Sequence, residues 1–356
     1  MERVKLEKGN RHNVRLIIFF VILSFLLTFT TKGKTQEIKK PYNIEIYTFQ
    51  VGTSTYAFGV GQAKFINEQS KWLRAKAIEI PNTVITAKML IEEPDKRTKI
   101  FGFIDTEDPR NGNPPFDAYK PPYKNIVMVA AFGTVFNGLV TLDPNIQRAA
   151  DFSGKKVGLG IGPSMARVSL PREAILASGA QNVRFVEYDF MGGVRALKDG
   201  IIQGLLVAGF CIDPSTKKFV PNPAFSELLS TAKVYFVSFE DNSYNNIAKK
   251  FGRHLAESKL PPGSISPMQT KPWNVAADVI GWACDRTMPE DVVYEYVRIM
   301  AENVTKYGEF HPTGKGLTKK FMARINQPIE YVHPGALKYY KESGLDKEIE
   351  KKWIEE

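Results

Sequence analysis

After residue 40, most of the chain switches between short segments in which apolar and polar residues alternate and longer segments in which apolar residues recur at helical spacing. Residues 42–50 alternate as a half-buried strand does, and residues 57–70 carry apolar side chains three and four positions apart, which predicts a helix. By the same criteria we expect further strands at residues 74–80, 100–104, 126–132, 138–142, 156–159, 183–188, 205–210 and 273–284. We expect further helices at residues 84–93, 146–151, 192–200, 247–256, 289–307 and 334–343. This order predicts an α/β fold, whose ligands bind at the carboxyl ends of the strands.

Residues 155–179 join a predicted strand to a predicted helix through a glycine-rich turn. The glycines form a GxGxG pattern, which is neither the dinucleotide fingerprint nor a phosphate loop, so no nucleotide cofactor is expected. The helix begins either at Ser164, with a kink at Pro171, or near Ser169, where a proline in the first turn is tolerated. Backbone N–H groups at the helix start favour an anion, although tight packing by the glycines explains the pattern equally well.

Hydroxyl and amide side chains gather at the first two predicted strand-to-helix turns. They can bind a polar ligand, and aromatic rings beside them can stack on it. Helix capping and core packing are the alternative roles. The residues are Thr53, Ser54, Thr55 and Tyr56 in the first turn and Asn82 and Thr83 in the second.

Residues 105–123 contain five prolines, and we expect no regular element there. A proline-dense excursion of this length is uncommon inside a compact domain. It is either a surface insertion or a segment that docks a partner or covers a site.

The length of 356 residues suits two domains, and the hydrophobic share of 43% is that of a globular protein with a sizeable core. Residues 1–40 contribute +6 to the net charge of +10, which leaves +4 for the rest of the chain. Because this excess is mild and no basic run with interleaved aromatic residues is present, we expect no nucleic-acid partner.

The N-terminal 40 residues have the character of an export signal. Five basic side chains precede residues 16–29, an apolar run broken only by Ser24 and Thr28. The run is shorter than the roughly 20 residues of a membrane-spanning helix, and its basic flank fits a signal peptide. We expect export to the periplasm or the outer face of the cytoplasmic membrane; both cleavage and retention as an anchor are open.

The cysteines and histidines do not form a recognisable site. Cys211 and Cys284 each lie in an apolar run, which favours two separately buried thiols over a disulfide. The four histidines show no metal-ligand spacing, so no metal is expected. Motifs of nucleophilic and metal-dependent enzymes are missing from the sequence as well, which argues against an enzyme.

The order of several segments resembles the TAXI-type solute receptors of TRAP transporters. These segments are the turn at residues 52–59, INEQS, DFSGKKVGLGIGPSMA, ALKDG and VHPGALKYYKESG. Each is weak alone, but their order is specific, and the resemblance covers about residues 42–345.

The resemblance implies a type II periplasmic-binding-protein fold: two lobes, each a sheet flanked by helices, joined by hinge strands. Residues 41–137 with 279–356 would form lobe 1, and residues 138–278 would form lobe 2. It also implies a receptor that binds a small organic anion, such as a carboxylate, dicarboxylate or acidic amino acid, between the lobes. The receptor would deliver this solute to membrane permease subunits of a TRAP transporter.

By the same resemblance Thr53 to Tyr56 match the first ligand loop and Ser164, Met165 and Ala166 match the second, so the helix is expected to begin at Ser164. Asn82 and Thr83 replace a smaller Gly/Ser-rich turn of the family, which makes glutamate a poor candidate for the solute. Arg167 and Arg172 could assist an acidic ligand, with surface charge the favoured role for each. The alternatives are a receptor for an ATP-driven importer, a signalling ectodomain on an uncleaved anchor, and a transferase or synthase built on the same two-lobed fold.

Overall fold

The structure is a computed structural model that describes residues 39–49, 51, 53–213, 218–254 and 256–351. The expected export signal at residues 16–29 lies outside these residues. Residues Pro41–Glu356 form one compact unit. Within the described residues, no helix combines the length and the apolar character needed to cross a membrane.

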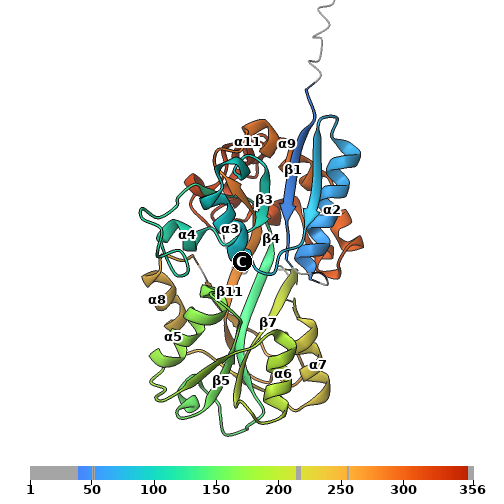
Figure 1. The fold of residues 1–356 in the computed structure, drawn as a ribbon. Helices are drawn as coiled ribbons and strands as arrows, with labels where there is room; N and C mark the ends of the chain where they lie inside the picture. The colour runs from blue at the N-terminus through green and yellow to red at the C-terminus, as the bar shows by residue number, and fades with distance from the viewer. Residues whose placement is uncertain (1–38, 50, 52, 214–217, 255, 352–356) are drawn as a thin grey trace, which may run out of the picture. The chain divides into compact units, whose positions relative to one another are not determined.

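Strands and helices alternate along the unit, which confirms the α/β fold class (Figure 1). The strands are β1 (Tyr42–Tyr47), β2 (Leu73–Ile78), β3 (Ile100–Phe103), β4 (Ile126–Thr141), β5 (Lys156–Leu159), β6 (Arg184–Glu187), β7 (Gly204–Asp213), β8 (Lys218–Pro221), β9 (Tyr235–Val237), β10 (Ala256–Leu260) and β11 (Trp273–Asp285). The α-helices are α2 (Ser54–Gln69), α3 (Thr83–Glu92), α4 (Glu107–Asn111), α5 (Leu170–Ala177), α6 (Phe190–Lys198), α7 (Pro223–Thr231), α8 (Ser243–Lys250), α9 (Glu290–Glu302), α10 (Lys319–Ala323) and α11 (Pro334–Glu342). Shorter turns of helix are η1 (Pro94–Lys96), η2 (Ala149–Phe152), η3 (Met165–Ser169), η4 (Val304–Glu309), η5 (Pro312–Gly316), η6 (Ile329–Tyr331) and η7 (Asp346–Glu348).

The strands form one sheet, whose main order is β2-β1-β3-β11-β4-β7-β5-β6; β8 pairs with β7, β9 with β4 and β10 with β11. At one end β1 pairs in parallel with β2 and β3, and at the other end β5 pairs in parallel with β6 and β7. The long strands β4 and β11 are antiparallel and connect these two parallel groups, as Figure 1 shows. Parallel neighbours end at the same edge of a sheet, so each group brings its strand-to-helix turns together.

Strand β4 replaces the two strands predicted at residues 126–132 and 138–142, and that prediction was wrong in dividing them. The break in the pattern is Gly133, whose φ of 146° few other residues adopt. The partner strand β11 shifts register nearby, between Ile280 and Gly281. A bulge of this kind bends a strand without ending it.

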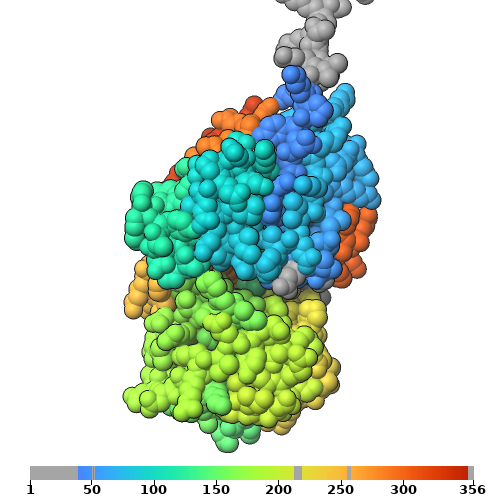
Figure 2. All heavy atoms as spheres, viewed as in Figure 1, coloured from blue at the N-terminus to red at the C-terminus, as the bar shows by residue number. Residues whose placement is uncertain are grey.

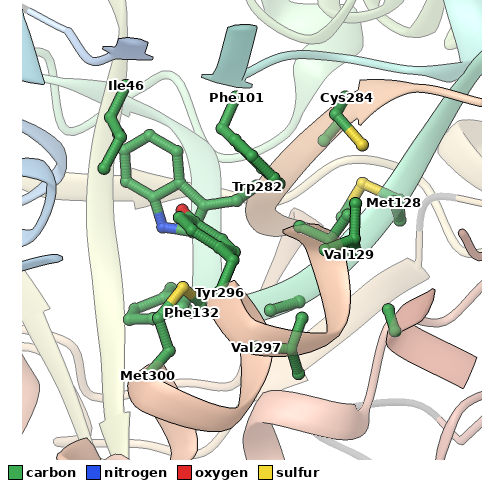
Figure 3. Packing of buried hydrophobic residues seen from close by; sticks show 14 of the residues in the cluster. Ile46, Phe101, Met128, Val129, Phe132, Trp282, Cys284, Tyr296, Val297 and Met300 are labelled. Atoms are coloured by element: carbon green, nitrogen blue, oxygen red, sulfur yellow. The ribbon is translucent and has the colours of Figure 1, made fainter. Parts of the chain in front are cut away.

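The buried apolar side chains pack in separate clusters along β4 and β11. The first cluster joins β1, β2, β3 and the first half of β4 with α2, α9 and α11. Figure 3 shows its centre, where Trp282 of β11 lies among Phe101, Phe132 and Tyr296. Two further clusters lie on residues 136–276, one with α5 and α8 and the other with α6 and α7. Figure 2 shows these residues, coloured mainly green and yellow, gathered apart from the blue and teal N-terminal residues. The lobe boundaries expected at residues 137–138 and 278–279 remain a prediction.

Three other expectations need correction. Residues 146–151 were expected to form a helix, but only the short 3-10 turn η2 is present there. The helix expected at residues 247–256 begins earlier, as α8, and stops before Gly252, whose φ of 62° is left-handed. The proline-dense residues 105–123 do contain a regular element, α4, because Asp105 accepts hydrogen bonds from the N–H groups of Glu107 and Asp108 at its start.

Cys211 and Cys284 are both buried and no disulfide joins them, which confirms the interpretation of two separately buried thiols. Burial raises the pKa of Cys284 well above its usual value. Its thiol is therefore neutral at physiological pH.

Candidate functional site

The start of α2 holds the first group of predicted site residues. Thr53 caps the helix, and its hydroxyl accepts a hydrogen bond from Tyr56 N at 3.3 Å. The Ser54 hydroxyl is buried, with the residue only 2% exposed, and it has no hydrogen-bond partner among the described residues. A buried hydroxyl without a partner is costly, so this position calls for an acceptor or donor that the described residues do not supply. Thr55 is buried and Tyr56 is half-buried beside it.

The start of α3 lies at the same edge of the sheet, because β1 and β2 are parallel. Asn82 caps α3 by accepting from Ile85 N at 3.2 Å, and Thr83 is the first residue of the helix. The two turns also touch directly, since Val51 N donates to a carboxylate oxygen of Glu79 at 3.0 Å. The structure therefore brings the first and second predicted loops together.

The helix after β5 begins at Ser164, as expected from the resemblance. The Ser164 side chain accepts from Arg167 N, and the first turn, η3, is a π-helix. The α-helical hydrogen bonding of α5 begins only at Leu170, so Pro171 falls in the first turn of α5. The proline thus removes no hydrogen bond from an established α-helix. A π-helical turn reconciles the two starts that the sequence left open.

Met165 and Ala166 lie in this first turn but face different surroundings. The Met165 side chain is buried in the cluster of α5 and α8. The carbonyl oxygen of Ala166 accepts from the Tyr244 hydroxyl at 3.3 Å. Both residues can therefore offer a ligand their backbone N–H groups, which point outward at a helix start.

Arg167 is not the surface charge that was expected. Its Nε is buried without a hydrogen-bond partner among the described residues, although the residue as a whole is partly exposed. The guanidinium carbon lies 3.8 Å from the centre of the Phe190 ring at the start of α6. Burial lowers the pKa of Arg167 to about 10, which leaves it charged at neutral pH. Arg172 is exposed and lies over Phe185 at 5.6 Å, in keeping with surface charge.

A second buried arginine, Arg253, sits among four carboxylates that sequence reasoning did not find. Its Nη1 lies 2.5 Å from Asp105 and 2.7 Å from Asp108, and its Nη2 lies 3.2 Å from Asp278. Glu107 lies 3.9 Å from Nε. The arginine side chain is 1% exposed, and the side chains of Glu107 and Asp108 are 5% exposed. This cluster ties α4 to the segment after α8 and to the middle of β11.

Carboxylates outnumber the positive charges in this cluster, and the pKa values of its buried carboxyl groups are raised. Burial raises the pKa of Asp108 to about 7, against the attraction of Arg253. Burial also raises the pKa of Asp278, whose side chain is more exposed, at 30%, than that of Asp108, at 5%. The guanidinium itself is held charged by these neighbours, which raise the pKa of Arg253 despite its burial.

The proline-dense segment is anchored through the same region. Asn111 and Asn113 each donate from Nδ2 to the carbonyl oxygen of Phe251, at 3.0 and 2.9 Å, and Asn111 also donates to the carbonyl oxygen of Gly252.

Of the residues that the structure places, none form a group of three or more His, Cys, Asp or Glu side chains suited to a metal ion. The contacts of Arg253 with Asp105, Asp108 and Asp278 make this acidic cluster an ion-pair network.

A family model described as the NMT1-like family matches residues 46–344, most of the chain. The chain belongs to the NMT1-like family. The match contains all the predicted site residues and both buried arginines of the candidate site.

Several solved structures are similar to this NMT1-like protein at low identity. The periplasmic aliphatic sulphonate binding protein SsuA from Escherichia coli is 13% identical, with 87% of this chain and 91% of that chain covered and a TM-score of 0.45. A TctC solute binding protein from Polaromonas is 13% identical, with 78% and 89% covered and a TM-score of 0.46. MatC from Rhodopseudomonas palustris, with bound malate, is 14% identical, with 88% and 99% covered and a TM-score of 0.45.

Proposed function

We propose that this NMT1-like protein is an extracytoplasmic solute receptor that binds a small organic anion and does no chemistry on it. The observation that carries the proposal is the buried Ser54 hydroxyl, which has no partner among the described residues and lies at the start of the 16-residue helix α2. Helix starts present N–H groups and a partial positive charge, and a hydroxyl beside them completes a site for an anionic oxygen.

The same chemistry recurs at the other predicted loops. Ser164 already accepts a hydrogen bond from Arg167 N, but its O–H remains able to donate to a carboxylate. Met165 and Ala166 would add N–H groups, and Asn82 and Thr83 would border the first loop. In this proposal the turns after β1 and β2 form one side of the site and the turn after β5 forms the other, across the two predicted lobes.

The proposed partners are the membrane subunits of a TRAP-type permease, as the resemblance to TAXI receptors implies. The export signal expected at residues 16–29 supports a place outside the cytoplasm, in the periplasm or at the outer face of the membrane. Delivery to an ATP-driven importer is the second candidate, because the same receptor chemistry serves both kinds of transporter.

Ser54→Ala and Thr53→Ala should separate binding from capping. We expect Ser54→Ala to leave stability unchanged or slightly raised, because it removes an unpaired buried hydroxyl, and to weaken solute binding by about 0.5–1.5 kcal/mol. Thr53→Ala should lower the free energy of unfolding by about 1 kcal/mol through loss of the helix cap. Urea unfolding measures the change in stability. Calorimetric titration with the solute that binds the wild-type protein most tightly measures the change in affinity. A loss of stability in Ser54→Ala with unchanged affinity would remove α2 from the site.

A further inference from the structure

Arg167 differs from the other buried arginines in lacking an acceptor. Arg253 contacts carboxylates, Arg324 Nε donates to Glu348 at 2.9 Å, and Arg110 Nη1 donates to Gln327 at 3.0 Å. Among the residues placed by the structure, Arg167 has no ion pair and no side-chain hydrogen bond, and its one described partner is the Phe190 ring. A guanidinium stays charged, and burying an unpaired charge is unfavourable.

The surroundings hold this guanidinium in place. A Cβ added to Gly160 would lie 2.8 Å from Arg167 Cβ and 3.3 Å from both Cζ and Nε, so only glycine leaves room for the side chain. Phe190 covers the guanidinium from the start of α6. Glu187 of β6 forms no ion pair with Arg167 among the described residues; its carboxylate accepts a hydrogen bond from Gly162 N at 2.9 Å. Among the residues that the structure places, the Arg167 guanidinium at the carboxyl ends of β5 and β6 is thus charged and without an acidic partner.

We propose that Arg167 binds the carboxylate of the solute, and that the solute is an organic monocarboxylate with an apolar body. This inference rests on the proposed receptor function and narrows it. The planar guanidinium fork matches a carboxylate with two parallel hydrogen bonds, and a single unpaired charge calls for a single anionic group.

The apolar body is inferred from two exposed apolar residues that are sequence neighbours of Gly160 and Phe190, the residues that contact Arg167. Ile161, next to Gly160, is 61% exposed, and Met191, next to Phe190, is 43% exposed. Large apolar side chains exposed beside a polar anchor are typical of ligand sites, where they contact the non-polar part of the ligand. No second cationic side chain interacts with Arg167 among the described residues, so a second carboxylate would find no positive partner beside it.

Calorimetric titration of the full chain with matched acids and amides tests this inference. The probes are hexanoate, phenylacetate, hexanamide, phenylacetamide, succinate and L-glutamate. We expect at least one of the two monoacids to bind about 10- to 100-fold more tightly than its amide, the range that charged hydrogen bonds provide. Succinate and glutamate should bind more weakly than the monoacid.

The variant Arg167→Met distinguishes an arginine that binds the solute from one that only stabilises the fold. It should lose the preference for acid over amide, and the Tm of the ligand-free protein should stay the same or rise, because an unpaired buried charge has been removed. Arg172→Met, an exposed arginine on the same helix, is the matched control and should keep full affinity.

The outcomes separate this inference from the receptor function. Equal affinity of the wild-type protein for acid and amide overturns the role of Arg167 even if the variant fails to fold. Tight binding of an uncharged, cationic or dicarboxylic solute in preference to the monoacids overturns the solute class but leaves a receptor. Unchanged acid affinity in a folded Arg167→Met variant with a lowered Tm shows a structural arginine. Binding of no small molecule at all removes the receptor function itself.

Discussion

Replacing Arg253 with methionine is expected to lower the free energy of unfolding by about 3–5 kcal/mol, because removing the guanidinium leaves the buried Asp108 without its positive partner. Asp108 and Glu107 have side chains only 5% exposed, and Asp105 and Asp278 lie beside them at the same guanidinium. Equilibrium unfolding in urea measures the loss. Arg298→Met is the control: its pairs with Glu295 and Glu302 lie on the surface of α9, so at most about 1 kcal/mol should be lost.

The loss should also grow with pH. Burial already raises the pKa of Asp108 to about 7 in the folded protein, above its value in the unfolded chain. A carboxyl group of this kind stabilises the fold below its unfolded pKa and loses that contribution as the pH rises through the folded pKa. Without Arg253 the folded pKa rises further, so the destabilisation should be larger at pH 8 than at pH 5. A loss that is below 1 kcal/mol, or equal at both pH values, would contradict the ion-pair account.

Trp282→Ala is expected to cost about 3–5 kcal/mol of stability, as large aromatic deletions in a packed core do. The indole is 1% exposed and lies 6.3 Å from the Phe132 ring and 6.4 Å from the Phe103 ring, measured between ring centres. A Cβ on Gly59 would come within 3.4 Å of the indole, so α2 packs closely on this side chain.

Trp282→Phe provides the matched comparison. It keeps an aromatic ring in the same place, so its cost should fall clearly below that of the alanine variant. Chemical denaturation of both variants and the wild-type protein gives the two differences. Equal losses in both variants, or less than about 1 kcal/mol in the alanine variant, would show that the indole does not fill the centre of the first cluster.

Periodicity predicted the strands well because their apolar runs are short and separated by turns. Each strand predicted from the sequence overlaps an observed one, and the alternation of strand and helix gave the α/β class. It failed where one residue changes the geometry, as Gly133 does by bending β4 without ending it. Apolar spacing alone did not predict α7. The start of this helix is marked by its capping residue Asn222 and by Pro223 in its first turn.

The candidate site was predictable where it depends on turns and hidden where it depends on long-range contacts. Ser54 and Ser164 stand at strand-to-helix turns, which sequence spacing reveals. The burial of Arg167 depends on Phe190, 23 residues further along the chain, and on the space beside Gly160. In the Arg253 cluster, Arg253 and Asp105 pair across 148 positions of the chain, so no local pattern could have found it. In the sequence, the cluster is indicated by the three acidic residues at positions 105–108.

A ligand screen on the wild-type protein tests the receptor function most directly. Thermal-shift measurements against monocarboxylates, dicarboxylates, amino acids and keto acids, followed by calorimetric titration of any hit, measure binding without assumptions about the site. We predict saturable binding of an organic anion with one solute per chain and a Tm that rises with solute concentration, as ligand linkage requires. No saturable binding of a solute from any of these classes would contradict the account.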